Sequence, residues 1–275
     1  MGQKVNPISL RTPINKRWSS KSFFPNFNYT SLLHQDLQIQ KYVYGILYNF
    51  NIICNRCIIK RINDKIFLNI YIYLRIINPV DKELIKLVST RKKDRNFRKK
   101  KVRGLRKTST SSFLSISRIL EMSLSKLTST TISVRFFPLY SVTKNKYYKS
   151  ISFISRSLRF LNSITYLHLF DLAISTRSAI LLSQFISLNL HNHIRNVRFF
   201  LRFIDRLLSL SMAHYGFRGV KLSIKGRLNG ARRARSIVLQ KGKVPLNTIS
   251  ASISYGFSNA MTIYGLCSVK VWIYI

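Results

Sequence analysis

Acidic residues are scarce in this sequence of 275 residues. It holds 8 Asp and Glu against 47 Lys and Arg, which gives a formal net charge of +39. A compact chain with that charge repels itself, whereas a polyanion neutralises it and releases counterions wherever a cation covers a phosphate. The scarcity of acids therefore predicts a nucleic-acid partner, with a cationic protein of a membrane surface as the weaker alternative.

The same scarcity argues against an enzyme of nucleic-acid chemistry. Nucleases and polymerases hold metal ions with clustered carboxylates, and this chain has no Asp or Glu after Asp205. It also lacks a GxxxxGK phosphate loop, a nucleophile elbow and a paired histidine and carboxylate. We therefore expect neither enzymatic activity nor a cofactor.

Cysteine is rare as well. Three residues, Cys54, Cys57 and Cys267, are too few for a disulfide scaffold and indicate a reducing compartment. Cys54 and Cys57 have the spacing of half a zinc site, but no second Cys-x-x-Cys follows and no histidine spacing completes it. Burial of the thiols as small apolar groups is the simpler interpretation, and no metal site is expected.

A long apolar run that would suit a membrane span is missing. Val244 to Val269 carries no charge, but it contains Pro245, Asn247 and several serines, and its apolar residues alternate at a period of two. That alternation is typical of a strand. The opening MGQKVNPISL resembles neither a secretory signal nor a long amphipathic presequence, so we expect no membrane span and, in an organelle, synthesis inside it.

Glycine is uncommon but concentrated. Of 10 glycines, seven lie between Gly216 and Gly265. This predicts a turn-rich C-terminal sheet whose first two strands are joined by a tight hairpin at Asn229-Gly230. The strand candidates are Gly219 to Leu228, Ala231 to Gln240, Val244 to Tyr255 and Leu266 to Ile275. Their alternation places apolar residues on one face and Lys221, Ser223 and Lys225 on the other.

The rest of the chain divides by composition. Residues 1–28, interrupted by prolines, are expected to form an N-terminal arm. Residues 29–90 contain a candidate helix, two strand-like runs and a short helix from Asp81 to Ser89. Residues 91–165 are expected to be a basic and Ser-rich insertion or linker. Residues 166–275 contain two helices, from Ser178 and from Val197, and then the strands, so the expected class is α+β.

Clustered cations are the candidate RNA-binding residues. In the segment from Arg91 to Lys107, 11 of 17 residues are Lys or Arg, which suits a strap along phosphates or, alternatively, a solvated disordered segment. Arg195, Arg198, Arg202 and Arg206 line one helix face, which is either a phosphate contact or a solvated face. The full candidate set is Lys4, Arg11, Arg91, Lys92, Lys93, Arg95, Arg98, Lys99, Lys100, Lys101, Arg198, Arg202, Arg206, Lys221, Lys225, Arg227, Arg232, Arg233, Arg235, Lys241 and Lys243.

Several motifs occur in an order that resembles one protein family. MGQKVNP, GVKLSIKGRLNGARRARS, GKVPLNT, ISYG, TIYG and VKVWIYI together resemble the ribosomal protein S3 family of the small subunit. The resemblance is strong over Ser178 to Ile275, looser over Tyr29 to Ser89, and absent from Arg91 to about Tyr166. It implies a type II K homology domain followed by a C-terminal domain of two helices on a four-stranded, mainly antiparallel sheet.

The resemblance also implies a function. Members of this family sit in the head of the small subunit, bind ribosomal RNA, contact neighbouring head proteins and help to form the channel by which messenger RNA enters. The main rival is a free organellar RNA-binding factor, such as an intron-maturation factor or an RNA chaperone. Sedimentation with the small subunit distinguishes the two.

The sequence departs from the family in ways that matter. No glycine lies between Gly45 and Gly104, so the G-x-x-G loop of a K homology domain is missing where NPVDKEL stands and the domain is degenerate. On the second helix only Arg202 matches the basic family run, whereas Arg232 and Arg233 make the hairpin more basic. These departures and the heavy use of Ile, Phe, Asn, Lys, Tyr and Ser suggest a mitochondrially encoded copy, with a plastid as the alternative.

Overall fold

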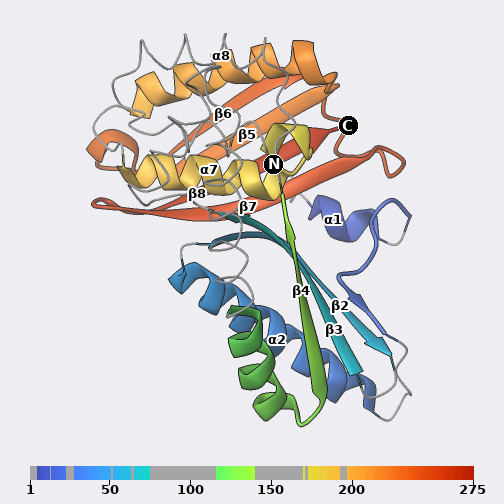
Figure 1. Ribbon diagram of the computed structural model, residues 1–275. Coiled ribbons are helices and arrows are strands. Elements are labelled where there is room, and N and C mark those ends of the chain that lie inside the picture. The colour runs from blue at the N-terminus through green and yellow to red at the C-terminus, as the bar shows by residue number, and fades with distance from the viewer. Residues whose placement is uncertain are drawn as a thin grey trace, which may run out of the picture. The chain divides into compact units, whose positions relative to one another are not determined.

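The computed structural model describes residues 5–12, 14–22, 28–50, 52–62, 65–74, 116–139, 170, 173–192 and 197–275. The chain divides into two compact units, one of Met1–Trp18 with Tyr140–Ile275 and one of Ser19–Leu139. Each unit contains a four-stranded sheet with helices (Figure 1). The α+β class predicted from the sequence is confirmed.

The N-terminal unit is a mixed sheet covered by helices. Its strands lie in the order β1-β2-β3-β4, with β2 (Ile52–Ile62) antiparallel to β3 (Lys65–Leu74). Helix α2 (Tyr29–Asn49) buries Ile39, Val43 and Leu47, which recur every four residues and so share one face. These side chains pack in one core with the buried residues of β2 and β3.

Two expected segment boundaries were wrong. Residues 116–128, which fall in the expected insertion, are helical, and Leu120 and Leu124 are fully buried in the core that α2 covers. Strand β4 (Thr131–Pro138) then pairs in parallel with β3. In the expected arm, β1 (Ser20–Lys21) pairs in parallel with β2. Weak periodicity concealed these elements because burial of their few apolar residues depends on long-range pairing.

The two cysteines of the N-terminal unit lie in its core. A register irregularity between Cys54 and Arg56 inserts one residue into β2. Such a bulge shifts the alternation of side chains, so residues three apart can face the same side. Cys54 and Cys57 are both buried, at 5% and 2% exposure. The short helix expected from Asp81 to Ser89 falls outside the described residues.

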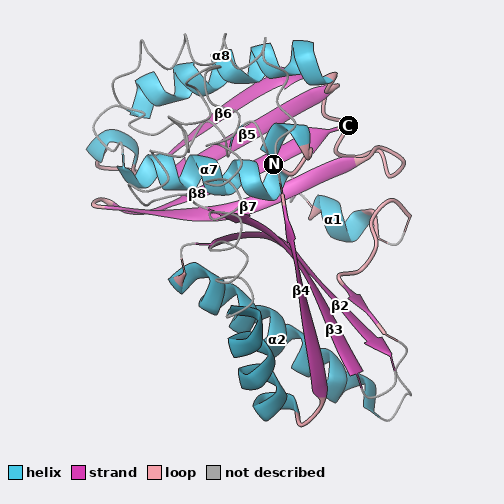
Figure 2. Cartoon of the chain, viewed as in Figure 1, coloured by secondary structure: helices cyan, strands magenta, loops and turns pink. Residues whose placement is uncertain are grey.

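The C-terminal unit places two helices on one side of its sheet, as Figure 2 shows. Helices α7 (Ala179–Asn192) and α8 (Val197–Tyr215) precede the strands, which lie in the order β6-β5-β8-β7 and are antiparallel throughout. The predicted alternation is confirmed in β5 (Gly219–Gly226) and β8 (Gly265–Tyr274). Six apolar side chains of these strands are buried, namely Val220, Leu222, Ile224, Val269, Val271 and Ile273.

The connection between β5 and β6 is longer than predicted. Gly226 pairs with Arg235, the first residue of β6 (Arg235–Gly242), so residues 227–234 form a loop in place of a two-residue turn. Asn229 and Gly230 do adopt positive φ angles of 55° and 70°, the conformation that favours these residue types. The loop is long because Leu228, only 7% exposed, points into the unit and Asn229 bonds to α8.

The third C-terminal strand begins later than predicted. Strand β7 runs over Ile253–Thr262, so the segment from Val244 to Ser252 is a loop. Four of its carbonyls, those of Pro245, Leu246, Thr248 and Ala251, accept hydrogen bonds from Arg11, as described below. Against α7 the strand is close-packed: a Cβ on Gly256 would lie 2.2 Å from the carbonyl oxygen of Ala179. Ser258 Oγ also donates a hydrogen bond to the carbonyl of Ser183, at 2.7 Å.

Candidate nucleic-acid interface

Helix α8 carries an exposed row of arginines. Its apolar side chains Phe200, Ile204 and Leu207 are buried, at 6%, 0% and 0% exposure. Residues four apart lie on one helix face, and the arginines on the opposite side from this core, Arg198, Arg202 and Arg206, are all exposed. The folded unit thus fixes three cations in a line on its surface. Arg195, the fourth predicted member, lies outside the described residues.

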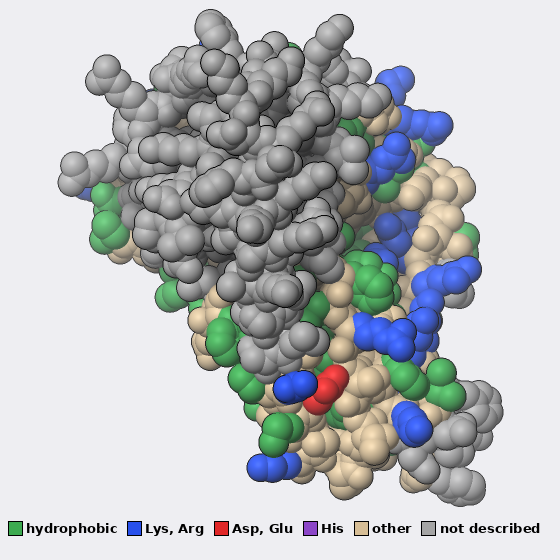
Figure 3. All heavy atoms as spheres, in the orientation of Figure 1, with side chains coloured by type: hydrophobic (Ala, Val, Ile, Leu, Met, Phe, Trp, Pro, Cys, Tyr) green, Lys and Arg blue, Asp and Glu red, His purple; other side chains and the backbone are tan. Residues whose placement is uncertain are grey.

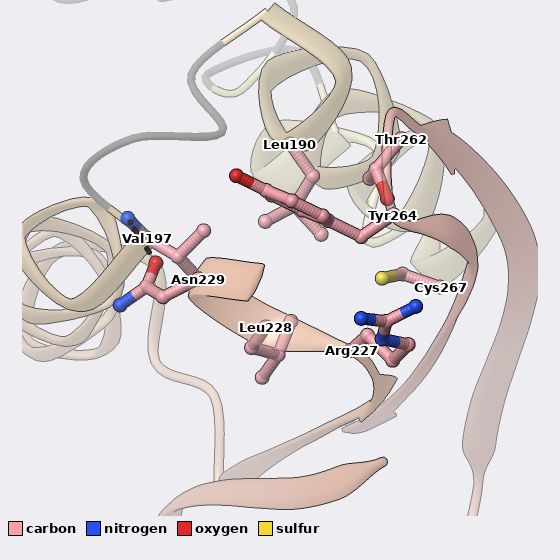
Figure 4. A pocket seen from close by; sticks show the side chains of 8 residues that line it. All are labelled: Leu190, Val197, Arg227, Leu228, Asn229, Thr262, Tyr264 and Cys267. Atoms are coloured by element: carbon pink, nitrogen blue, oxygen red, sulfur yellow. Dashed lines mark hydrogen bonds between the residues drawn. The ribbon is translucent and has the colours of Figure 1, made fainter. Parts of the chain in front are cut away.

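The loop between β5 and β6 brings more arginines to the beginning of α8. Asn229 Oδ1 accepts a hydrogen bond of 3.3 Å from the backbone N–H of Val197, the first residue of α8 (Figure 4). Arg232, Arg233 and Arg235, which follow Asn229 closely, are exposed. The Asn229 bond therefore places this arginine-rich loop beside the end of α8 that carries Arg198.

Arg227 has a different role in the same loop. Its Nε donates a 2.9 Å hydrogen bond to the carbonyl of Ala231, and its guanidinium lies 6.0 Å from the centre of the Tyr264 ring. Figure 4 shows its side chain beside Cys267 and Tyr264. A Cβ on Gly230 would come within 3.1 Å of the same ring. Arg227 thus holds the loop in shape, and part of its donor capacity is already used.

The predicted lysines divide between the two faces of the sheet. Lys241 lies in register with Val220 on the helix side and forms an ion pair of 2.9 Å with Asp205 of α8. Lys243 is exposed at the end of β6. Lys221 and Lys225 project from the opposite face, because successive residues of a strand alternate. The basic residues of β5 therefore do not share a surface with the α8 arginines.

Arg11 was expected to contact RNA, and the structure corrects this expectation. Its side chain is fully buried, at 0% exposure. It follows α1 (Pro7–Leu10) and donates hydrogen bonds to five backbone carbonyls, at distances of 2.7 to 3.2 Å. The acceptors are Pro7, Pro245, Leu246, Thr248 and Ala251. Burial lowers the pKa of the guanidinium from its ordinary value. Arg11 joins the N-terminal segment to the loop before β7, and its side chain is closed off from solvent.

Lys4 and the basic block, comprising Arg91, Lys92, Lys93, Arg95, Arg98, Lys99, Lys100 and Lys101, lie outside the described residues.

The described surface is strongly biased toward positive charge. Lys and Arg side chains recur over the face seen in Figure 3, whereas acidic ones are rare there. The ion pairs found among the described residues are Arg61 with Asp36 and Lys241 with Asp205. Few cations are therefore neutralised within the described part of the chain, and phosphate oxygens suit them as partners.

Two features are absent from the described residues. Among the described residues, no cluster of His, Cys, Asp or Glu is arranged to hold a metal ion. No helix in the same part of the chain combines the length and apolar character that crossing a membrane requires.

The candidate list omitted two cations of the C-terminal sheet. Arg218 Nη1 donates a 3.0 Å hydrogen bond to the Tyr274 hydroxyl, and its guanidinium lies 5.4 Å from that ring. Lys270 lies in register with Ser223 on the same sheet face as Lys221 and Lys225. The alternation of apolar and polar residues in the last strand predicts that Lys270 faces away from the core, so the sequence did contain a signal for this residue. Arg218 precedes its strand and had no such signal.

Comparison with known proteins gives consistent similarities. A profile of the family described as "Ribosomal protein S3, C-terminal domain" matches residues 190–273. Small ribosomal subunit protein uS3 of Borrelia garinii subsp. bavariensis is 30% identical over 278 residues, covering 100% of this chain and 70% of the relative. The proteins of the same name from Carboxydothermus hydrogenoformans and Ehrlichia chaffeensis are 28% and 27% identical. Both cover 100% of this chain, with 91% and 96% of the relatives.

Proposed function

This chain belongs to the family of the small ribosomal subunit protein uS3, and we propose that its arginine-bearing surface attaches it to ribosomal RNA within that subunit. The protein is a structural ribosomal component and not an enzyme. The observation that carries the RNA-binding proposal is the row Arg198, Arg202 and Arg206 on α8, adjoined by the loop that Asn229 anchors.

Electrostatics supports this use of the surface. Arginine binds phosphate oxygens through two parallel hydrogen bonds, and these contacts position a protein on RNA without reading its bases. Because each covered phosphate releases counterions, the affinity falls steeply as salt rises. The complete absence of acids after Asp205 means that no carboxylate of the C-terminal sheet competes for these arginines.

Within the subunit, we assign α8 to the messenger RNA entry channel and the Arg232 and Arg233 loop to ribosomal RNA. Arg202 is the helix residue that matches the basic run of the family. The neighbouring proteins of the subunit head are the further partners in this proposal. The basic block from Arg91 to Lys107 provides an additional phosphate-binding segment in place of the missing glycine loop.

We further propose that the protein works in a mitochondrial ribosome. The support is compositional: a sequence rich in Ile, Phe, Asn, Lys, Tyr and Ser is typical of AT-rich organellar genomes. Cell fractionation with an antibody against the protein tests this directly. Recovery in mitochondria supports the proposal, and recovery in plastids or the cytosol contradicts it.

Sedimentation tests the ribosomal proposal. The tagged full-length chain is expected to sediment with the small subunit after a moderate salt wash. The Arg232→Gln/Arg233→Gln variant is expected to dissociate at lower salt, whereas Arg202→Gln stays bound but crosslinks less to messenger RNA carrying a photoreactive nucleotide. Recovery of the wild-type chain only in the soluble fraction would show a free RNA-binding factor instead.

A further inference from the structure

The sheet of the C-terminal unit has a second face, opposite the helices. On β7, Gly256 and Ser258 contact α7, so Tyr255 and Phe257 project from the other side. Their register partners on β8 are Trp272 and Lys270. Lys221 and Ser223 of β5 continue the same two rows. We call this surface, made by Lys221, Lys225, Tyr255, Phe257, Lys270 and Trp272, the open face.

Aromatic rings and ammonium groups alternate across the open face. Tyr255 and Trp272 have ring centres 5.5 Å apart, and Lys221 Nζ lies 5.9 Å from the Trp272 ring. In the next row Phe257 lies opposite Lys270. Phe257 is 50% exposed, so half of its surface is open to a partner. An exposed ring stacks well on a flat group, and the neighbouring ammonium groups attract negative charge. A partner that is both flat and negatively charged therefore suits this face.

The charge of the open face restricts what that partner is. The strands from Gly219 to Tyr274 contain no Asp or Glu, and among the described residues Lys221, Lys225 and Lys270 form no ion pair. A polyanion thus fits this face. The combination of rings with a cationic track is how proteins bind single-stranded nucleic acid, since bases stack on the rings while the backbone follows the charges. In a double helix the bases are stacked on one another, so no base face is accessible to the rings.

We propose that the open face binds single-stranded RNA, with a base stacked on Phe257 beside Trp272 and the adjoining phosphates on Lys221, Lys225 and Lys270. This site lies across the sheet from the α8 arginines and is a second RNA contact of the protein. This inference rests on one part of the proposed function, namely that the chain contacts RNA in the ribosome. The partner strand is any unpaired segment with accessible bases.

Trp272 makes the proposal directly measurable. The chain has two tryptophans, Trp18 and Trp272, so the Trp18→Phe variant of the full chain leaves Trp272 as the only tryptophan. A short oligoadenylate is added, and an abasic oligomer of equal length and charge serves as the reference. We expect oligoadenylate to quench the Trp272 emission and to bind more tightly than the abasic oligomer, on the order of tenfold for one stacked base.

Substitutions at Phe257 complete the test. Phe257→Ala is expected to remove the preference for oligoadenylate over the abasic oligomer, whereas Phe257→Tyr retains it. Tyr48→Ala, which removes a 79% exposed aromatic from α2, is the matched control and leaves the preference unchanged. Equal affinities for the two oligomers, or an unchanged Trp272 emission, would overturn the proposal. So would quenching by ribosomal proteins alone, since that identifies a protein-binding face.

The failure of this inference is separable from failure of the proposed function. If the wild-type chain sediments with the small subunit while Trp272 does not respond to oligoadenylate, the open-face site is wrong and the ribosomal role stands. If oligoadenylate binds with quenching while the chain fails to sediment, the open face is an RNA site in a free factor.

Discussion

Arg11 Nη2 donates a hydrogen bond of 2.7 Å to the backbone carbonyl of Thr248, which lies 237 positions further along the chain. The same guanidinium serves four other carbonyls, and Asn15 Nδ2 adds two bonds, to Ile249 and Ser250, at 3.0 and 2.9 Å. The N-terminal segment is thereby an integral part of the C-terminal unit.

The first prediction concerns this connection. Arg11→Ala is expected to lower the free energy of unfolding of the C-terminal unit by roughly 2–4 kcal/mol, because several buried carbonyls lose a charged donor. Arg11→Lys restores little, since an ammonium lacks the planar fork of donors. Urea unfolding followed by tryptophan emission measures the effect, because Trp18 and Trp272 both belong to this unit. The control is Arg17→Ala at a nearby exposed position. An Arg11→Ala variant of unchanged stability but weaker RNA affinity would restore the RNA-binding interpretation.

A second prediction compares the two ion pairs. Asp36 is 1% exposed and accepts hydrogen bonds from Arg61, at 2.6 Å, and from Ser20. Asp36→Ala leaves the Arg61 guanidinium, whose side chain is 10% exposed, without its carboxylate and is expected to cost about 3 kcal/mol. Asp205→Ala breaks the half-exposed pair with Lys241 and is expected to cost less than about 1 kcal/mol. Chemical denaturation of both variants gives the comparison, and equal losses would contradict it.

The third prediction is a pH dependence of the N-terminal unit. Burial raises the pKa of the Cys54 and Cys57 thiols from 9.0 to about 12. The folded unit favours the neutral thiol, so this contribution to stability is complete below pH 9.0 and is lost as the pH rises toward about 12. Stability measured across this range should fall less steeply in the Cys54→Ala/Cys57→Ala variant. In the native protein at neutral pH, both thiols should resist a thiol reagent that labels them after denaturation. Rapid native labelling would contradict the burial.

A fourth prediction uses two glycines with opposite surroundings. Gly45 lies within α2 with no atom near its missing Cβ, so Gly45→Ala should stabilise the N-terminal unit by about 0.5–1 kcal/mol. A Cβ on Gly256 would lie 2.2 Å from the carbonyl oxygen of Ala179 in α7, so Gly256→Ala should destabilise the C-terminal unit by about 1–3 kcal/mol. Thermal unfolding followed by circular dichroism measures both. A stabilising Gly256→Ala would disprove the close approach of β7 to α7.

The sequence by itself determined the partner class, the fold class and much of the C-terminal unit. Net charge is a sum that folding does not alter, and a period of two or of 3.6 residues identifies which faces of β5, β8 and α8 are apolar. Asn229 and Gly230 likewise revealed a reversal of the chain through their tolerance of positive φ.

Only the tertiary structure decided where each charge goes. In the sequence nothing distinguishes Arg11 from the other arginines, and its burial follows from the packing of α1 on the loop before β7. In the same way, Lys241 differs from Lys243 because α8 places Asp205 beside it. Residues 116–139 join the N-terminal sheet through parallel pairing with β3, a contact between distant segments. Local sequence patterns do not predict such contacts, because burial and hydrogen bonding depend on which segments meet in space.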